Sequence, residues 1–114
     1  MLSDRAKTAL GDILRNINLA EQFTRDIPVE QFITDNLRLY ATIRVLEIVS
    51  EASRRVPEEI KARHPGVPWR QIAAAGNVYR HGYDVVVPEV IWETAQTGFT
   101  ALRSAVEAEL GRSG

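Results

Sequence analysis

Cysteine is absent from this chain of 114 residues. Without it the chain can form no disulfide, no thiolate metal site and no thiol nucleophile. The chain has two histidines, which lie far apart in the sequence and have no cluster of carboxylates beside them. Two such histidines do not make a metal site, so we expect neither a metal ion nor a cofactor.

Long hydrophobic runs are also lacking. No stretch approaches the roughly 18 apolar residues that a membrane span requires. The first residues, MLSDRAKTALGDILRN, carry charges every few positions and lack the apolar core of a signal peptide. We therefore expect a cytoplasmic protein without membrane contact.

An excess of charge of one sign is missing too. Fourteen basic residues face fifteen acidic ones, and the resulting formal charge of −1 does not single out a nucleic-acid-binding protein. Twelve of the basic residues are Arg. Because a planar guanidinium suits bidentate contact with phosphate, this excess is a weak indication of phosphate binding.

The size and composition are those of one ordinary globular domain. The apolar fraction is 45% and the charged fraction 25%, and a chain of this length has room for a single core. We expect one helical domain over residues 1–110 and a flexible tail over residues 111–114.

Apolar residues recur at steps of three and four, and no segment alternates as a strand would. The fold class predicted is all-α, an antiparallel helical bundle of four main helices with short loops. A short helix should also begin at Pro57. The four main helices are expected from residue 4 to about 25, from Thr34 or Asp35 to about Arg55, from Trp69 to His81 and from Pro88 to Leu110.

The second main helix has an unusually broad apolar surface. One row of apolar residues is thickened by a second row on the neighbouring side. A surface this broad indicates either a central helix or a helix that also packs across a dimer interface. The two rows are Leu37, Ala41, Val45, Ile48 and Ala52, and Leu39, Ile43, Leu46 and Val49.

Candidate chemistry is concentrated in residues 67–83, VPWRQIAAAGNVYRHGY. Asn77 and His81 share a helix face, because positions four apart lie about 40° from each other. Arg80 lies about 100° round from His81, but its side chain is long enough to swing toward it. Tyr83 follows just past the helix, where its hydroxyl could fold back toward the imidazole.

These side chains can support catalysis without a metal. A His can act as general acid or base, and a nearby Asn or Arg can stabilise a developing anion. Cleavage of a phosphodiester by a neighbouring 2′-hydroxyl needs only those functions. Each residue also has a structural interpretation: His81 and Asn77 as local hydrogen-bonding groups, Arg80 as a solvated charge and Tyr83 as loop packing.

Other polar and aromatic residues have simpler expectations. Glu51 lies mid-helix in a largely apolar segment, so it should pair with an Arg, within the chain or across a dimer, and could orient the site. Trp69 and Trp92 are expected to anchor the core, and Tyr79 to pack. His64 precedes a proline in a loop and should be exposed.

Several short motifs together resemble the HepT family of the HEPN superfamily. The resemblance spans residues 2–110 and includes the order of the helices. The motifs that carry it are Ser50-Glu51-Ala52, Trp69-Arg70, Asn77, His81-Gly82-Tyr83 and Ile91-Trp92.

The resemblance implies a function. Proteins similar to this are the toxin halves of toxin–antitoxin pairs, dimeric all-helical ribonucleases that work without a metal. It implies a composite site at a homodimer interface that cleaves RNA such as tRNA or mRNA. It also implies a partner, an MntA-like nucleotidyltransferase antitoxin that silences the toxin by AMPylation of the motif Tyr, here Tyr83.

One position departs from the family motif R-N-x-x-x-H-x-Y. The motif Asn, His and Tyr fall on Asn77, His81 and Tyr83, but the motif Arg falls on Gly76. Arg80, one turn later, could take its place in space. The alternative hypothesis is a helical binding module that has lost catalysis and binds its antitoxin partner or RNA without cutting. A third is that the motif region is purely structural.

Overall fold

The computed structural model describes residues 2–113, except for the side chains of Tyr83 and Ser113. It confirms the all-α fold class, with no strand in the part of the chain described. The helices are α1 (Asp4–Thr24), α2 (Val29–Phe32), α3 (Asn36–Arg54), α4 (Glu58–Arg63), α5 (Trp69–His81), η1 (Tyr83–Val85), α6 (Pro88–Thr97) and α7 (Thr100–Ser113).

Side-chain caps mark the starts of the two longest helices. The Ser3 hydroxyl accepts a hydrogen bond from the Ala6 N–H at 3.1 Å, so α1 begins where the sequence predicts. The Asp35 carboxylate accepts from the Arg38 N–H at 3.1 Å and caps α3. Each cap satisfies a backbone donor that the first helical turn leaves without a partner.

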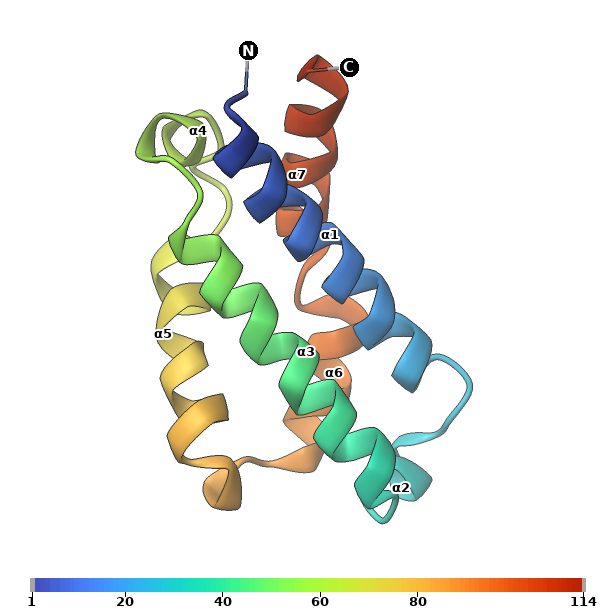
Figure 1. Cartoon of the computed structure of the whole chain (residues 1–114). Coiled ribbons are helices and arrows are strands. Elements are labelled where there is room, and N and C mark those ends of the chain that lie inside the picture. Colours follow the sequence, from blue (N-terminus) through green and yellow to red (C-terminus); the bar gives the residue numbers. More distant parts are fainter. Residues whose placement is uncertain (1, 114) are drawn as a thin grey trace.

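The helix α3 is the central element of the bundle (Figure 1). It packs against α1 on one side and α5 on the other, and it also contacts α6. This arrangement accounts for most of its broad apolar surface and confirms the central-helix interpretation. The fully buried side chains of the core come from α1, α2, α3 and α7 and include Leu10, Ile13, Ile17, Phe32, Leu46, Leu102 and Val106.

One apolar residue of α3 does not join the core. Leu37 continues the apolar row of the sequence pattern, but 82% of it is exposed. It lies in the first turn of α3, at the end of the molecule, where the apolar period continues although no helix covers that position.

The prediction of a single helix from Pro88 to Leu110 is wrong, because two helices occupy this segment. The helix α6 ends at Thr97, and α7 begins at Thr100. At Gly98 a Cβ atom would lie 2.8 Å from the carbonyl oxygen of Thr94, so the close turn of the backbone leaves no room for a side chain. The break lets α6 contact α1, α2 and α3, while α7 packs against α1.

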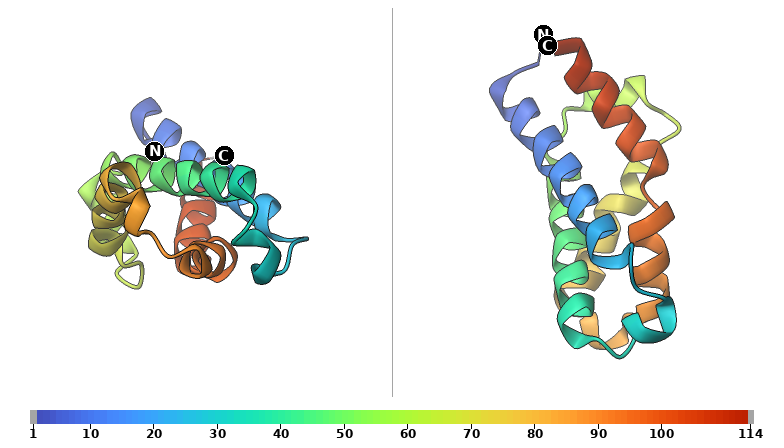
Figure 2. Two further views of the ribbon diagram at one scale, coloured as in Figure 1. Left: turned by 90° about the horizontal axis from the view of Figure 1, so that it is seen from below. Right: turned by 90° about the vertical axis from the view of Figure 1, so that its right-hand side faces the viewer.

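The end of the last helix also differs from the prediction. The sequence placed it at Leu110, whereas α7 continues through Gly111 and Arg112 to Ser113. The first turn of α1 and the last turn of α7 lie at the same end of the molecule, beside α4 (Figures 1 and 2). The end of α5, η1 and the start of α6 lie at the opposite end.

Candidate active site

The helix α5 has the bounds that the sequence predicts, Trp69–His81. At its start the Trp69 indole N–H donates to the His64 carbonyl at 3.0 Å, which ties the helix to the preceding loop. At its end the Gly82 N–H donates to the Val78 carbonyl at 2.9 Å. Ile72 and Gly76 are buried, so this face of α5 is turned toward the bundle.

The helices α5 and α3 lie close together at Gly76. A Cβ atom at this position would lie 3.0 Å from the Ser50 Cβ, tighter than almost all real contacts of that kind. Ser50 itself is 2% exposed. The position of the motif Arg is therefore a helix contact in this chain, and it is occupied by the residue without a side chain.

The two helices run antiparallel along this contact. On one side of the crossing, Arg54 Nη2 donates to the Ala73 carbonyl at 2.9 Å. On the other side, Arg80 reaches Glu47, which lies earlier in α3. Residue numbers thus fall along α3 as they rise along α5, and Arg80 lies one turn beyond the crossing.

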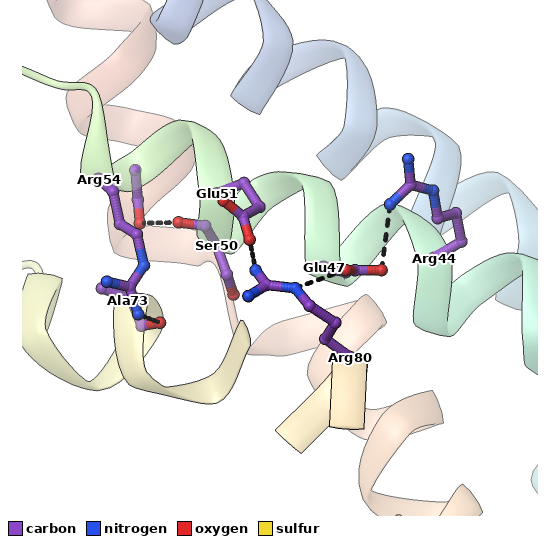
Figure 3. Close-up of polar contacts among 8 residues, drawn as sticks. Arg44, Glu47, Ser50, Glu51, Arg54, Ala73 and Arg80 are labelled. Carbon is purple, nitrogen blue, oxygen red and sulfur yellow. Dashed lines mark hydrogen bonds and ion pairs between the residues drawn. The ribbon is translucent and has the colours of Figure 1, made fainter. Parts of the chain in front are cut away.

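Arg80 is bound to two carboxylates of α3 (Figure 3). Its Nε donates to Glu47 Oε2 at 3.2 Å, and its Nη2 forms an ion pair with Glu51. The other oxygen of Glu47 accepts from Arg44 Nη1 at 3.1 Å. The arginine partner expected for Glu51 is therefore Arg80 of the same chain.

Asn77 and His81 lie on the outward side of α5. Both are exposed, and neither side chain has a hydrogen-bond or ion-pair partner among the described residues. Both are therefore accessible to a ligand. The backbone of Tyr83 lies in η1, immediately after the helix, but its side chain falls outside the described part of the structure.

The aromatic residues expected to pack do so. Trp92 is partly buried against the core, and its indole N–H donates to the Ile27 carbonyl at 3.0 Å. Tyr79 also packs against the core, and burial raises the pKa of its phenol. Both rings are therefore partly buried packing groups, as the sequence predicts.

The prediction that His64 is exposed is wrong, because its side chain is partly buried and bound. Its Nε2 is 2.6 Å from Glu109 Oε2, and Arg63 donates to both oxygens of the same carboxylate, at 3.2 and 2.6 Å. The Arg63 hydrogen bonds lower the Glu109 pKa to about 2, against the opposing effect of burial and with further help from His64. This cluster joins α7 to α4 and the loop after it, and α4 lies at the end of the molecule opposite the last turn of α5 (Figure 1).

Two residues of the site were missed from the sequence, Glu47 and Arg44. Glu47 lies one turn before Glu51 on the same face of α3, in an equally apolar segment. Two carboxylates four residues apart on one helix face would have been a usable signal. Arg44 carried no such signal, because its role depends on Glu47.

Comparison with known proteins places the chain in a family. The family model described as ribonuclease HepT-like matches residues 13–109. The chain belongs to the HepT-like ribonuclease family. The resemblance found in the sequence is thereby confirmed, and no solved structure matches the chain.

Individual relatives agree with the family model. A Thermococcus cleftensis protein named "Probable ribonuclease HepT" is 39% identical over 101 residues, covering 89% of this chain and 92% of its own. A Methanocaldococcus jannaschii protein named as an RNase is 33% identical over 101 residues, covering 89% and 93%. A third, named as an RNase in Caldanaerobacter subterraneus, is 34% identical over 85 residues, covering 75% and 76%.

In this HepT-like chain the candidate site combines residues of two helices. α5 contributes Asn77, Arg80 and His81, while α3 contributes the carboxylates that bind Arg80. No group of three or more His, Asp or Glu side chains within the described residues could hold a metal ion. No helix of the described chain is long and apolar enough to cross a membrane.

Proposed function

We propose that this HepT-like chain is a metal-independent ribonuclease of the cytoplasm that acts as the toxin of a toxin–antitoxin pair. The observation that carries the proposal is the imidazole of His81, which is exposed and has no partner among the described side chains, next in the chain to the bound guanidinium of Arg80. Family membership supports the same activity.

The chemistry would be transfer of a phosphodiester to the neighbouring 2′-oxygen. The 2′-oxygen forms a bond to phosphorus, the bond to the 5′-oxygen breaks, and one proton leaves the 2′-hydroxyl while another reaches the leaving oxygen. The His81 imidazole would act as general acid or base in these proton transfers. Asn77 and Arg80 would contact the phosphate.

Two proton transfers suggest two copies of the chain. Among the described side chains only the His81 imidazole lacks a partner, because the His64 imidazole is bound to Glu109 at 2.6 Å. A homodimer that brings two His81 side chains to one groove would supply both an acid and a base. The composite site implied by the family resemblance therefore has a chemical reason in this chain.

Exposed apolar side chains indicate where the second copy would bind. They lie on or next to α2, the start of α3, the end of α5, η1 and the start of α6, which are all at the same end of the molecule (Figures 1 and 2). A Leu37→Asp substitution should convert a dimer into a monomer on analytical ultracentrifugation, and an unchanged mass would contradict this interface. The exposed apolar residues are Ile33, Leu37, Tyr40, Val78, Val85, Val87 and Val90.

Neutralisation is proposed to follow the family pattern. An MntA-like nucleotidyltransferase would transfer AMP from ATP to the Tyr83 hydroxyl, with pyrophosphate as the leaving group. Incubation with such an enzyme and ATP should raise the mass of the chain by one AMP. Incorporation that persists in Tyr83→Phe would rule out this acceptor.

The decisive experiment is cleavage of end-labelled tRNA and single-stranded RNA in EDTA. The unmodified protein should cut, and His81→Ala should lose the activity without a change in melting temperature. Gln22→Ala, an exposed change on α1, serves as the control. Cleavage by His81→Ala at the unmodified rate would show the mechanism to be wrong.

A second candidate function has its own supporting observation. The close contact of Gly76 with Ser50 fits a binding module that lost the motif Arg and kept the scaffold. Such a protein would bind its antitoxin or RNA and leave end-labelled RNA intact. The same EDTA assay, run beside a binding assay, separates the two functions.

A further inference from the structure

Arg80 does not project freely into solvent, because α3 binds it through two carboxylates (Figure 3). Glu47 accepts from Nε at 3.2 Å and Glu51 pairs with Nη2. Nη1 has no hydrogen-bond partner among the described side chains, which do not include that of Tyr83. Since a guanidinium carries N–H donors on all three nitrogens, the carboxylates orient the group and leave donors available.

Glu47 is the more firmly held of the two carboxylates. Its side chain is 16% exposed, compared with 39% for Glu51. Both of its oxygens are used, one by Arg80 and the other by Arg44 at 3.1 Å. The carboxylate cannot rotate without losing one of these bonds, so Glu47 fixes the direction from which Arg80 is held.

The charges of this cluster balance. The guanidinium groups of Arg44 and Arg80 face the carboxylates of Glu47 and Glu51. A phosphate approaching Arg80 therefore meets no net negative charge. Removal of Glu47 would leave an excess of positive charge that attracts RNA more strongly but orients Arg80 less well.

We propose that Glu47 is a positioning residue of this site. It acts through Arg80, holding the guanidinium so that Nη1 can donate to a phosphate of bound RNA in place of the motif Arg missing at Gly76. The inference rests on the proposed ribonuclease function and assigns a role to a residue that does not itself touch the RNA.

The first test separates turnover from binding. In Glu47→Ala we expect kcat to fall roughly 10- to 100-fold, the size of effect that a misplaced group can cause. Glu47→Gln should lose less, because its amide oxygen can still accept from Nε. KM should stay equal or fall, because the variant carries more positive charge. The control is Glu58→Gln, whose side chain is 93% exposed on α4.

The second test asks whether Glu47 acts through Arg80. In an Arg80→Ala background, Glu47→Ala should cause no further loss of kcat, since residues that act as a unit are not additive. A fully additive loss would overturn the proposal. So would an unchanged kcat in Glu47→Ala, or a rate loss matched by unfolding at the assay temperature.

A third measurement keeps the inference separate from the ribonuclease proposal. If the unmodified protein cuts no RNA, the proposed function fails. The Arg80 Nε–H signal in NMR then tests separately whether Glu47 positions the Arg80 guanidinium. A non-cleavable 2′-O-methyl RNA should shift this signal in the unmodified protein and leave it unshifted in Glu47→Ala. Equal shifts, or no shift in either protein, would overturn the positioning role.

Discussion

At the scale of single residues, the contact between Gly76 and Ser50 explains where the guanidinium of this site lies. A side chain at position 76 would start 3.0 Å from the Ser50 Cβ, inside the helix crossing. One turn later, Arg80 is 37% exposed and reaches two carboxylates. The crossing therefore disfavours an arginine where the family motif has one, while Arg80 has room four residues on.

This contact predicts the outcome of restoring the motif. Gly76→Arg should lower the free energy of unfolding by about 1–3 kcal/mol, because overpacking forces the helices apart. Urea denaturation measures the change. The matched control is Gly11→Ala in α1, where a Cβ meets nothing within 4 Å. That change should raise stability by about 0.5–1 kcal/mol, and equal effects of the two variants would contradict the argument.

The sequence could predict which candidate residues share one helix. That Asn77, Arg80 and His81 lie together on α5 follows from helical arithmetic, and the need of Glu51 for an arginine follows from its apolar surroundings. The pairing of Arg80 with Glu47 joins residues 33 positions apart. Such a contact depends on how α3 and α5 cross, which no local pattern determines.

At the scale of helices, local signals predicted most boundaries. Ser3 and Asp35 cap α1 and α3 at the predicted starts of these helices, and α5 ends at His81 as predicted, with Gly82 as its C-cap. The break between α6 and α7 was missed because the apolar period runs on across it, through Ala95, Phe99 and the residues that follow. A glycine inside such a pattern is tolerated in a helix, so only the close backbone at Gly98 reveals the break.

The break supplies a prediction for Gly98. An added Cβ would lie 2.8 Å from the Thr94 carbonyl oxygen and 3.0 Å from its Cα. Since backbone atoms must move to relieve this contact, Gly98→Ala should lower the free energy of unfolding by about 1–3 kcal/mol. Gly111→Ala in α7 meets nothing within 4 Å and is the control. Stabilisation by both substitutions in thermal melts would refute the prediction.

At the scale of the whole molecule, the two ends have different roles. The long axis measures 44 Å. One end carries the candidate active site. At the other end Glu109 joins α7 to α4 and the loop after it, because its carboxylate binds Arg63 and His64. Glu109 is 1% exposed, so this carboxylate is a buried connection between segments distant in sequence.

The buried carboxylate makes stability depend on pH in a defined direction. The Glu109 pKa is about 2 in the folded protein, below its ordinary value of 4.5. The folded state therefore favours the ionised form, and its stabilisation is full above about pH 5 and is lost as pH falls toward 2.

Substitution of Glu109 should remove this pH dependence. Glu109→Gln should cost about 1–3 kcal/mol at pH 7, because hydrogen bonds to a charged group are lost. The difference from the unmodified protein should shrink as urea denaturation is repeated between pH 5 and pH 2. Glu107→Gln, an exposed change on the same helix, is the control. A difference that stays constant over this range would disprove the role of the Glu109 charge.

The Gly76–Ser50 contact also restricts the order in which such a site could change over time. A helix crossing this tight disfavours an arginine at position 76, because a Cβ there would lie 3.0 Å from the Ser50 Cβ, so the two placements of the guanidinium compete. A lineage that moved from one placement to the other without losing its cationic group would need Arg80 and its carboxylate partners first. Closure of the crossing would then come last, and it would make a return to the earlier placement costly.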